Sequence, residues 1–482
     1  MLKPKYILIA IVLYLVAAYY SIGHNSPDEY YQILEFAAYK LGLGDVKFLT
    51  WEYHFHIRPA LQVWLAVFVY KVLAYFSVTN PFTIAFFLRL LAAFISLVAA
   101  FTFIKAFLTS IKNETSKKWF VLLSLFTWLI VYNSVRYSSE NISEKFFLLG
   151  FSLLFIPRFN RSLISYFFIG LLFGLSFDTR FQNLILIIVV YAWLISINNF
   201  KVIGGEDKKV VNLTKLISIT GGVLITVSIG ILIDKWFYGT WVFAAFNYLN
   251  MNLFKGMAAS FGIEPWYFYL LVAAFIPYGP FYIISTFISI KYKLKNPAIW
   301  LVIAYVVAHS LIGHKEIRFL IPVLCFMPLM IAYSLDLLID KQIVIKNGFK
   351  IFWKILWYIN CIFVILCAVI PSGTNVLLCK AIYDKFNQPM QFYAITQGGN
   401  LLNFYKRKNV ELVYINNINQ ANCDKNKVCL LALTCQQVKA NPQLNGKMIY
   451  RNCYDWLFKL NFNDWLDRAA VYNIYQINEE SK

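Results

Sequence analysis

The sequence predicts an all-α polytopic membrane protein that carries a small α/β domain at its C-terminal end. Hydrophobic residues make up 60% of the 482 residues and charged residues only 14%, whereas an average soluble domain has roughly 25% charged residues. Apolar stretches of about 17 to 25 residues recur between Ile7 and Ile370, and each is long enough to cross about 30 Å of hydrocarbon. After Pro371 they give way to short strand-like runs. These observations argue against a soluble fold.

The apolar stretches predict eleven transmembrane helices. The first follows the residues MLKPK, and because no small-residue cleavage site precedes His24, we expect a retained helix rather than a signal peptide. Segment 60–78 contains Gln62 and Lys71 and, as a span, would invert every later loop, so we expect it to lie in or dip into the outer interface. The expected spans are about 6–22, 83–107, 119–134, 146–157, 163–177, 182–197, 215–233, 266–290, 297–313, 319–338 and 351–371.

Positive charge predicts the orientation, because cytoplasmic loops carry an excess of Lys and Arg. The net charge of +20 then reflects basic loops beside anionic lipid headgroups, and no nucleic acid partner is expected. The connections that we place in the cytoplasm are 112–118, 157–161, 201–209, 291–295 and 340–350. The connections on the outer face hold nearly every unusual polar residue and are 24–58, 134–144, 177–180, 234–264 and 314–318.

Residues 372–482 differ in composition from the helical part at 1–371. The runs VELVYI at 410–415, VCLLAL at 428–433 and KMIYRNC at 447–453 are typical of short strands between Asn-rich turns. An odd number of spans places this part outside the cytoplasm, as an extracytoplasmic α/β domain. Five of the eight cysteines lie in this part. Their clustering suits an oxidising compartment, but five is an odd number and no pairing can be assigned.

The outer loop 24–58 holds the first candidate catalytic residues, Asp28 and Glu29. Pro27 precedes them, so a turn followed by a short helix would hold the Asp28 carboxylate in a fixed direction. A carboxylate held in this way suits proton abstraction from a hydroxyl group. The local alternative is an ordinary helix start, with Asp28 as the N-cap and Glu29 in the first turn.

The run LTWEYHFHIRP at 49–59 offers Trp51, Glu52 and Arg58 as substrate contacts. By itself this run is typical of an interfacial aromatic belt with charged side chains that reach water. A metal site built from His54, His56 and an acid is a weaker alternative. We expect neither a metal nor another cofactor.

The run HSLIGHKEIRFLIP places basic side chains at the outer end of a span. If this run is helical, His314 and Arg318 lie one turn apart on the same side, with Lys315 adjacent. Charges at a membrane boundary are unfavourable enough to indicate a function. Clustered Lys, Arg and His suit a phosphate or pyrophosphate group.

The remaining outer connections add polar residues with two interpretations each. Asn247 and Trp266 suit hydrogen bonding to and stacking on a sugar, although a plain interfacial loop has a similar composition. An acid, a cationic cluster and aromatic-polar loops on one face suit transfer from a phosphate-activated lipid to a hydroxyl acceptor. The residues that form either ion pairs with one another or part of a lipid-phosphate site are Arg136, Glu140, Glu144, Asp178 and Arg180.

Five blocks on the outer face are PDEYYQILE at 27–35, LTWEY at 49–53 with Arg58 after it, FYGTW…FNYLNMN at 237–252, FGIEPWYFYL at 261–270 and GHKEIRFLIPVL at 313–324. In residues, order and spacing they resemble the glycosyltransferase family 22, Alg9-like mannosyltransferases. The branch they resemble most adds the third mannose of the GPI anchor. The sequence departs from the family pattern at FDTR, residues 177–180, and in the tail around Cys435, which leaves the acceptor open.

The resemblance implies a GT-C fold, a polyprenyl- or dolichyl-phosphate mannose donor and a lipid-linked glycan acceptor on the non-cytoplasmic side. It implies Asp28 as the general base, with Glu29 beside it, and a metal-independent reaction that inverts the donor carbon. We expect donor phosphate contacts from Arg58, His314, Lys315 and Arg318. We expect substrate contacts from Trp51, Glu52, Arg136, Asp178, Arg180, Asn247 and Trp266.

Two other functions stay open at this point. A transporter or lipid flippase would use the same outer charges as a transient substrate site, and a non-catalytic relative would act as an assembly subunit. Membrane lipids are expected partners in every case. The short loops and the Lys-, Asn- and Ile-rich composition favour a bacterial inner membrane, and a eukaryotic chain would lie in the endoplasmic reticulum membrane.

Overall fold

The computed structural model describes residues 3–24, 26–159, 162–196, 213–276, 278–342, 347–373, 375–395, 402–424, 426–453, 455–468 and 471–477. It divides the chain into two compact units. The helical unit consists of Met1–Tyr20, Thr50–Phe68 and Phe87–Ile370, and the sheet unit of Ser21–Leu49, Val69–Phe86 and Pro371–Lys482. The basic connection predicted at 201–209 lies outside the described residues, as do parts of those predicted at 157–161 and 340–350.

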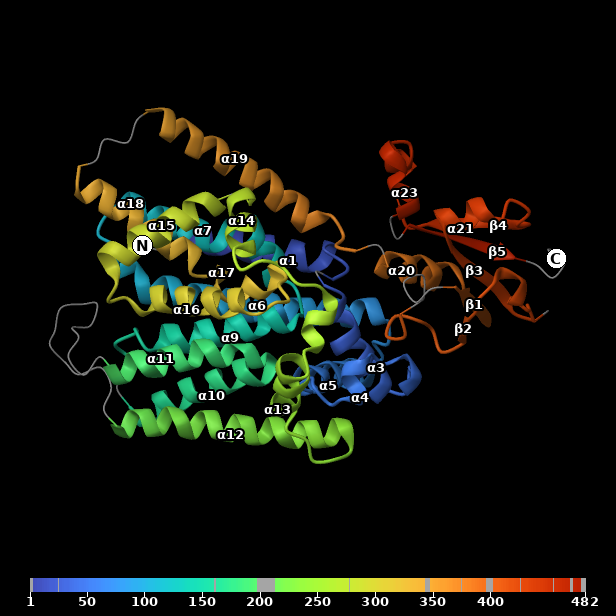
Figure 1. Ribbon diagram of the computed structural model, residues 1–482, viewed down its shortest axis with the longest axis horizontal. Helices are drawn as coiled ribbons and strands as arrows, with labels where there is room; N and C mark the ends of the chain where they lie inside the picture. The colour runs from blue at the N-terminus through green and yellow to red at the C-terminus, as the bar shows by residue number, and fades with distance from the viewer. Residues whose placement is uncertain are drawn as a thin grey trace. The chain divides into compact units, whose positions relative to one another are not determined.

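Every predicted span coincides with one or two α-helices (Figure 1), which confirms a mainly helical chain. The helices that lie wholly or partly in the helical unit are α1 (Pro4–Tyr20), α4 (Trp51–His54), α5 (Leu61–Tyr75), α6 (Pro81–Phe107), α7 (Glu114–Phe126), α8 (Trp128–Ser134), α9 (Ser139–Leu153), α10 (Leu163–Thr179), α11 (Leu184–Ser196), α12 (Leu213–Tyr238), α13 (Ala244–Leu249), α14 (Phe268–Phe275), α15 (Gly279–Lys293), α16 (Pro297–Leu311), α17 (Ile321–Leu324), α18 (Met327–Asp340) and α19 (Asn347–Val369).

Length and hydropathy separate these helices into two groups. Among the described residues, three are long and apolar enough to cross a membrane alone, namely Pro81–Ser110, Leu213–Tyr238 and Lys350–Val369. A pair bent by 58°, Ile317–Leu324 with Met327–Asp340, makes a fourth if it is counted as one span. Several apolar helices are shorter, including α1, α5, α10 and α16. The number of eleven spans and the interfacial position of 60–78 therefore stay predictions.

Two predicted spans contain breaks with identifiable causes. Pro328, at the second position of α18, has no backbone N–H, so the helical hydrogen bonds cannot continue from α17. Between α7 and α8 the backbone is extended at Thr127. The buried Asn360 of α19 bridges this second break, because its Nδ2 donates to the Phe126 carbonyl (2.7 Å) and its Oδ1 accepts from the Trp128 N–H (2.9 Å). Irregular backbone in apolar surroundings needs partners of this kind.

Glycines allow α10 and α12 to pack closely side by side (Figure 1). A Cβ atom at Gly170 would lie 2.0 Å from the Ile219 carbonyl oxygen, and one at Gly222 would lie 2.2 Å from that of Phe167. Small residues at such contacts are typical of helix pairs in membranes. On its other side α10 packs antiparallel to α9. The C-terminal end of α10 therefore lies beside the N-terminal end of α9.

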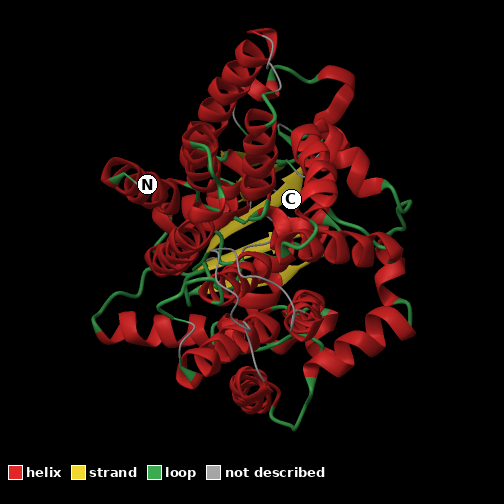
Figure 2. Ribbon diagram, turned by 90° about the vertical axis from the view of Figure 1, so that its left-hand side faces the viewer, coloured by secondary structure: helices red, strands yellow, loops and turns green. Residues whose placement is uncertain are grey.

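The sheet unit contains a five-stranded mixed sheet in the order β2-β1-β3-β5-β4 (Figure 2). β1 pairs in parallel with β2 and β3, and β5 pairs antiparallel with β3 and β4. The central strand β3 is buried at 429–433, which explains its continuous apolar run. The strands are β1 (Met390–Ala394), β2 (Val410–Tyr414), β3 (Val428–Thr434), β4 (Gly446–Arg451) and β5 (Tyr472–Ile477).

Short helices complete the sheet unit, so the predicted C-terminal α/β architecture is confirmed. β2, β3 and β4 are the three predicted strands, whereas β1 and β5 have no clear strand pattern in the sequence. Cys423 and Cys429 form a disulfide, which is a pairing that the sequence leaves unassigned. The helices are α2 (Pro27–Glu29), the π-helix η1 (Tyr30–Leu34), α3 (Glu35–Lys40), α20 (Asn375–Lys385), α21 (Cys435–Ala440), α22 (Asp455–Phe458) and α23 (Trp465–Arg468).

The two units differ from the predicted domain limits in one respect. Residues 21–49 belong to the sheet unit, whereas the prediction places the loop 24–58 with the helical domain at 1–371. The predicted limits of 1–371 and 372–482 stay a proposal. The structure nevertheless associates the segment that carries Asp28 with the C-terminal part of the chain.

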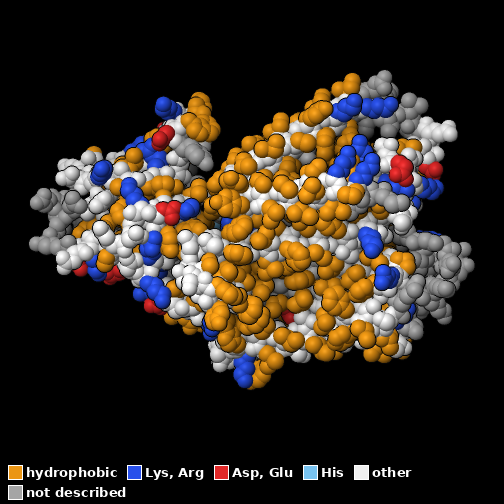
Figure 3. Space-filling view, turned by 180° about the vertical axis from the view of Figure 1, so that it is seen from behind, with side chains coloured by type: hydrophobic (Ala, Val, Ile, Leu, Met, Phe, Trp, Pro, Cys, Tyr) orange, Lys and Arg blue, Asp and Glu red, His pale blue; other side chains and the backbone are white. Residues whose placement is uncertain are grey.

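The exposed side chains of the helical unit are largely hydrophobic. Figure 3 shows hydrophobic side chains over a broad face of this unit. Ile164, Leu213 and Phe275 are each at least 72% exposed. Apolar patches of this size are unfavourable in water, whereas lipid tails contact such surfaces readily. The surface therefore supports a membrane protein.

Candidate active site

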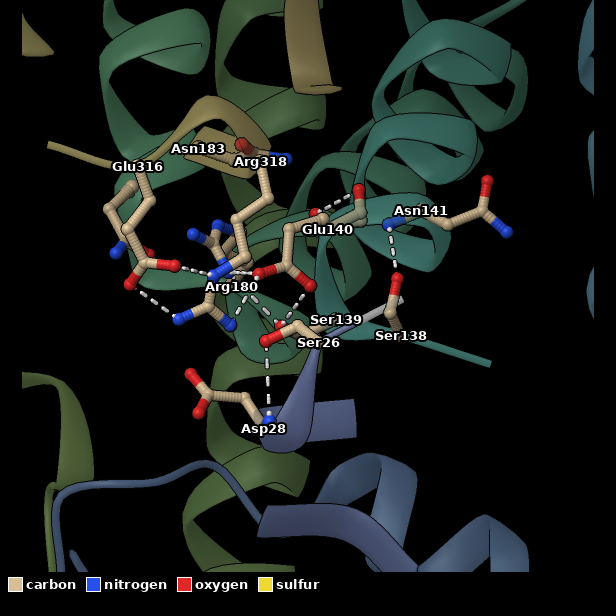
Figure 4. Close-up of polar contacts among 12 residues, drawn as sticks. Ser26, Asp28, Ser138, Ser139, Glu140, Asn141, Arg180, Asn183, Glu316 and Arg318 are labelled. Carbon is tan, nitrogen blue, oxygen red and sulfur yellow. Dashed lines mark hydrogen bonds and ion pairs between the residues drawn. The ribbon is translucent and has the colours of Figure 1, made fainter. Parts of the chain in front are cut away.

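Asp28 lies in the first turn of a capped helix in the sheet unit (Figure 4). α2 begins at Pro27, and Ser26 Oγ accepts a hydrogen bond from the Asp28 N–H (3.3 Å). Ser26 is therefore the N-cap, and the alternative in which Asp28 caps the helix is wrong. The Asp28 side chain is half-buried and Glu29 is buried. The expected turn before a short helix is confirmed.

In the helical unit, the loop after α4 brings Glu52 and Arg58 together. Arg58 Nη2 lies 3.4 Å from Glu52 Oε1, and the Arg58 guanidinium lies over the ring of Tyr248. The Tyr238 hydroxyl, at the end of α12, donates to the Arg58 carbonyl (2.7 Å) and accepts from the Arg58 N–H (3.3 Å). α12 therefore fixes the backbone of this loop.

An aromatic contact connects the same loop with the basic run around His314. Trp51 stacks on Phe261, with 6.1 Å between ring centroids, and the Phe261 ring lies 6.1 Å from that of His314. His314 Nδ1 lies 3.0 Å from the Gly262 carbonyl oxygen, and its Nε2 lies 3.2 Å from Glu316 Oε1. The predicted residues Trp51 and His314 therefore surround one phenylalanine.

The basic run itself is not helical at His314. α16 ends at Leu311, and a 3₁₀ turn starts only at Ile317. The expected one-turn spacing of His314 and Arg318 on a helix is therefore wrong. His314 and Arg318 still share a partner, because both contact the carboxylate of Glu316.

Lys315 binds backbone carbonyls at this loop. Its Nζ donates to the carbonyl oxygens of Glu264 (2.7 Å) and Ile312 (2.5 Å), and the residue is buried. An ammonium group bound to the carbonyls of Ile312 and of Glu264, 51 residues away, ties this loop to another stretch of the chain. Lys315 thus joins residues 264 and 312, and its contact with a donor phosphate stays a prediction.

Four charged residues form a network that we call the Glu140 cluster, consisting of Glu140, Arg180, Glu316 and Arg318 (Figure 4). Glu140 Oε1 lies 2.7 Å from Arg180 Nη1 and 3.5 Å from Arg318 Nη1. Glu316 binds Arg318 through two hydrogen bonds, to Nε (2.6 Å) and Nη2 (2.7 Å). Both guanidinium groups lie 5.5 Å from the ring centroid of Phe319.

Burial differs within the Glu140 cluster. The side chains of Glu140 and Arg180 are 3% and 6% exposed, whereas that of Glu316 is 36% exposed. The cluster holds two guanidinium groups and two carboxylates, so a further anion can bind the guanidinium groups where it replaces one of these carboxylates. Among the four, Glu316 is the carboxylate that a bound phosphate would replace most readily. Of the two predicted interpretations, the ion pair is present between Glu140 and Arg180, and the phosphate site stays a prediction.

Arg136 and Asp178 lie outside the Glu140 cluster. Arg136 is fully buried, with its guanidinium 4.6 Å from the ring centroid of Tyr132. Asp178 packs on α12 where Gly230 leaves room, since a Cβ atom there would lie 2.6 Å from Asp178 Oδ2. Asp234, one helical turn further, lines the same small cavity as Asp178. Asp178 and Arg180 therefore have different surroundings, although only one residue lies between them in the sequence.

Asn247 and Trp266 have different surroundings. Asn247 Nδ2 donates to the His56 carbonyl oxygen (3.4 Å). Trp266 is 67% exposed, and its ring contacts that of Tyr267 edge-on. Within the described part of the chain, no three His, Cys, Asp or Glu side chains are placed to hold a metal ion.

Two residues of this region are missing from the predicted set. Asp234 Oδ1 accepts a hydrogen bond from the Ala60 N–H (2.8 Å) and so positions the loop that contains Arg58. Tyr238 holds the Arg58 backbone directly. The signal that identifies Asp234 is an acidic residue within an apolar helix, which indicates a function by default.

Curated relatives include GPI alpha-1,2-mannosyltransferase 3 of Mus musculus and GPI mannosyltransferase 3 of Debaryomyces hansenii. They are 26% identical over 314 residues and 28% identical over 324 residues, respectively. Both matches cover 64% of this chain, but only 54% and 55% of the relatives. The matched region thus spans about half the length of these proteins.

Two solved structures share the fold. They are ArnT from Cupriavidus metallidurans bound to undecaprenyl phosphate, with a TM-score of 0.60, and the same protein in the apo state, with a TM-score of 0.56. Each match covers 99% of this chain and 98% of the other, at 10% identity. This identity supports a likeness of fold alone.

The sequence profile of the Alg9-like mannosyltransferases matches residues 5–398. This range includes the segment of Asp28, the loop of Arg58 and the whole Glu140 cluster. The resemblance of the five sequence blocks is therefore confirmed, and the chain belongs to the Alg9-like mannosyltransferase family.

Proposed function

We propose that this chain is a membrane glycosyltransferase of GT-C fold that transfers mannose from polyprenyl- or dolichyl-phosphate mannose to a lipid-linked glycan. Membership of a mannosyltransferase family supports the sugar, and the names of the GPI mannosyltransferases support the acceptor class. The related fold of ArnT was solved with undecaprenyl phosphate, which belongs to the same chemical class as the proposed leaving group.

The observation that carries the proposal is the Glu140 cluster in a chain of this family. Two arginines beside a half-exposed carboxylate suit a phosphate that exchanges with Glu316 on Arg318. Guanidinium groups bind phosphate through paired hydrogen bonds. They also stabilise the negative charge that develops on the phosphate as it leaves.

In the proposed reaction an acceptor hydroxyl oxygen attacks the mannose C1 atom. The bond between C1 and the phosphate oxygen breaks, and its electron pair leaves with the lipid phosphate. Asp28 takes the proton of the hydroxyl as general base, with Glu29 beside it. Attack from the side opposite the phosphate converts a β-linked phosphosugar into an α-mannoside, and no metal or cofactor takes part.

The other predicted residues keep their proposed roles with different support. Arg58 and His314 are partly exposed and suit donor phosphate contacts, as does Arg318. Lys315 is proposed to shape the phosphate loop as well. Arg180 is proposed to act on the substrate indirectly, because it holds Glu140, which also contacts Arg318. The proposed sugar or acceptor contacts are Trp51, Glu52, Arg136, Asp178, Asn247 and Trp266.

The proposed location is a membrane, with the reaction on its non-cytoplasmic face. The apolar exterior of the helical unit supports contact with membrane lipids. We propose a bacterial inner membrane, and the endoplasmic reticulum membrane if the chain is eukaryotic.

The test is transfer by the purified chain in detergent, with polyprenyl-phosphate mannose as donor and a lipid extract from a deletion strain as acceptor. Mass spectrometry of the lipids should show a gain of one hexose, and GDP-mannose should give none. Arg318→Ala should lower transfer by about 10²-fold. The exposed Arg158 provides a matched Arg→Ala control that should retain activity. Lipid or sugar flux without glycosyl transfer would overturn the proposal in favour of a transporter.

A further inference from the structure

The segment that carries Asp28 is held at its start by the C-terminal part of the sheet unit. Gly23 and Ser372 form a parallel bridge, in which the Ser372 N–H donates to the Ile22 carbonyl (2.6 Å) and the His24 N–H donates to the Ser372 carbonyl (2.7 Å). Gly23 has φ of 111°, and a Cβ atom there would lie 1.5 Å from the Ser372 carbonyl oxygen. Only glycine permits this contact.

The same segment is held again by a buried carboxylate at the start of α3. Glu35 is 4% exposed. Its Oε1 accepts hydrogen bonds from the Tyr30 hydroxyl and the Phe404 N–H (3.1 Å), and its Oε2 accepts one from Asn403 Nδ2 (2.7 Å). We call these four residues, Tyr30, Glu35, Asn403 and Phe404, the Glu35 cluster. They join the Asp28 segment to residues 403–404 of the tail.

Between these two attachments the helix changes pitch. Tyr30–Leu34 form a π-helix directly after Glu29, and α3 resumes at Glu35. Single π-helical turns occur often at functional sites. The ring of Tyr30 also stacks on Tyr405, with 6.0 Å between centroids, and Tyr405 stacks on Phe82 at 5.0 Å. Tyr30 therefore contacts the tail through its ring and Glu35 through its hydroxyl.

Packing alone does not explain a glutamate at this position. A buried carboxylate is unfavourable unless it is hydrogen-bonded, and an apolar side chain would avoid that penalty. The two directional hydrogen bonds from Asn403 Nδ2 and the Phe404 N–H, in contrast, fix the rotation and the height of the helix that carries the carboxylate, because both donors lie outside that helix. Asp28 lies two helical turns before Glu35 on the same continuous helical segment, so any rotation of that segment redirects the Asp28 carboxylate.

We propose that Glu35 is a positioning residue for the transfer reaction: through Tyr30, Asn403 and Phe404 it fixes the helix of Asp28 to the tail, so that the C-terminal part of the chain sets the direction of the general base. The inference rests on the proposed role of Asp28. It gives the tail a part in turnover that none of the predicted site residues provides.

The variants follow from the donors and acceptors of the cluster. Glu35→Leu removes every acceptor, and Asn403→Asp places a second carboxylate against Glu35. In the double variant Glu35→Gln with Asn403→Asp, the exchanged pair can again form one hydrogen bond, because the glutamine amide donates to the aspartate. Glu411→Gln is the matched control, since Glu411 pairs with Lys427 elsewhere on the same sheet unit.

Two readouts are measured on the full chain in detergent. We expect Glu35→Leu and Asn403→Asp each to lower kcat by about 10²-fold, with the donor KM changed less than about threefold, because the phosphate contacts are untouched. The kcat of the double variant should be at least about tenfold higher than that of Asn403→Asp. Glu411→Gln should match the wild type.

Hydrogen exchange provides the second readout and does not depend on activity. Residues 24–40 should exchange at least about tenfold faster in Glu35→Leu and Asn403→Asp, while β3 keeps its protection and so reports an intact fold. Asp28→Asn should abolish turnover without changing exchange in this segment. Tyr30→Phe is the milder variant if Glu35→Leu does not fold, with a smaller change in the same direction.

The outcomes separate this inference from the proposed function. Wild-type exchange at 24–40 in Glu35→Leu, or equal losses in Asn403→Asp and in the double variant, would overturn the positioning role. If the wild-type chain transfers no mannose while the exchange results hold, the proposed function fails and the attachment of the segment to the tail stands.

Discussion

The Glu35 cluster of the sheet unit and the Glu140 cluster of the helical unit both bury a carboxylate, but with different partners. Glu35 accepts from a phenol hydroxyl, an amide and a backbone N–H, all of them neutral. Glu140 lies between two guanidinium groups. The first cluster therefore contains a single ionisable carboxylate among neutral donors, whereas the second balances charge against charge.

This difference assigns different tasks to the two clusters. Neutral donors fix geometry through direction and distance, but they do not compensate the charge of a buried carboxylate. Guanidinium groups do compensate it, and they can exchange one anion for another. The Glu35 cluster suits a fixed support, and the Glu140 cluster suits a site where a phosphate arrives and leaves.

The largest expected effect comes from the charged cluster. Glu140→Gln removes the carboxylate that Arg180 and Arg318 share, so two largely buried cations lose their common partner. We expect the free energy of unfolding to fall by about 3–5 kcal/mol, seen as a lower melting temperature by tryptophan fluorescence in detergent. Glu114→Gln, which disrupts an exposed ion pair with Lys117, should leave that temperature unchanged. Equal melting temperatures for both variants would show that the buried charges do not support each other.

The neutral cluster predicts a dependence on pH. Burial raises the pKa of Glu35 above its ordinary value of 4.5, so the folded chain holds this proton more tightly than the unfolded chain. The contribution to stability is complete below pH 4.5 and is lost as the pH rises through the folded pKa, by up to about 1.4 kcal/mol per pH unit.

Glu35→Gln tests this dependence, because glutamine does not titrate. As the pH rises from 4, the melting temperature of the wild type should fall steadily relative to that of Glu35→Gln. A shift in the opposite direction would mean that the hydrogen bonds outweigh burial and that Glu35 is held as an anion.

Removing one neutral donor should have a smaller effect. Tyr30→Phe keeps the ring stacked on Tyr405 but deletes the hydroxyl that donates to Glu35. We expect a loss of about 1–2 kcal/mol in the free energy of unfolding, measured by denaturant titration with fluorescence. Tyr75→Phe, on an exposed tyrosine, serves as the control. If Tyr30→Phe lowered the free energy of unfolding as much as Glu140→Gln does, the neutral and the charged cluster would not differ in their contribution to stability.

The smallest effect on stability is expected at Glu316. This carboxylate is 36% exposed, so water replaces it readily on Arg318. Glu316→Gln should change the free energy of unfolding by less than about 1 kcal/mol, although it changes the charge beside the proposed phosphate site. A change above 3 kcal/mol in the same fluorescence assay would place Glu316 among the fixed members of the cluster.

The helices and three of the strands follow from the sequence because their signals are local. Apolar stretches of membrane length predict helices wherever they occur, and the run VCLLAL predicts β3 because a central strand is apolar on both faces. β1 and β5 are five and six residues long. They are no shorter than the predicted β2 and β4. MQFYA and YNIYQI show no clear strand pattern, however, so these two strands are defined by the neighbours they pair with, which come from other parts of the chain.

The site is predictable only where it depends on neighbouring residues. The turn at Pro27 and the capped helix start that carries Asp28 follow from four adjacent positions. The partners of Glu35 do not, because Asn403 lies 368 residues further along the chain. Similarly, the loop at His314 depends on Lys315 binding the Glu264 carbonyl, 51 residues away. A helical pattern in the sequence cannot reveal this contact with a distant carbonyl group.

Asp28→Asn measured against Glu29→Gln shows whether Asp28, and not the adjacent carboxylate, is the general base of the proposed transfer. Single-turnover transfer of mannose from polyprenyl-phosphate mannose is followed for both variants and for wild type. We expect Asp28→Asn to lower the rate by at least about 10²-fold, Glu29→Gln to lower it less, and both variants to keep the wild-type melting temperature. A wild-type rate in Asp28→Asn would contradict the role of Asp28 as general base.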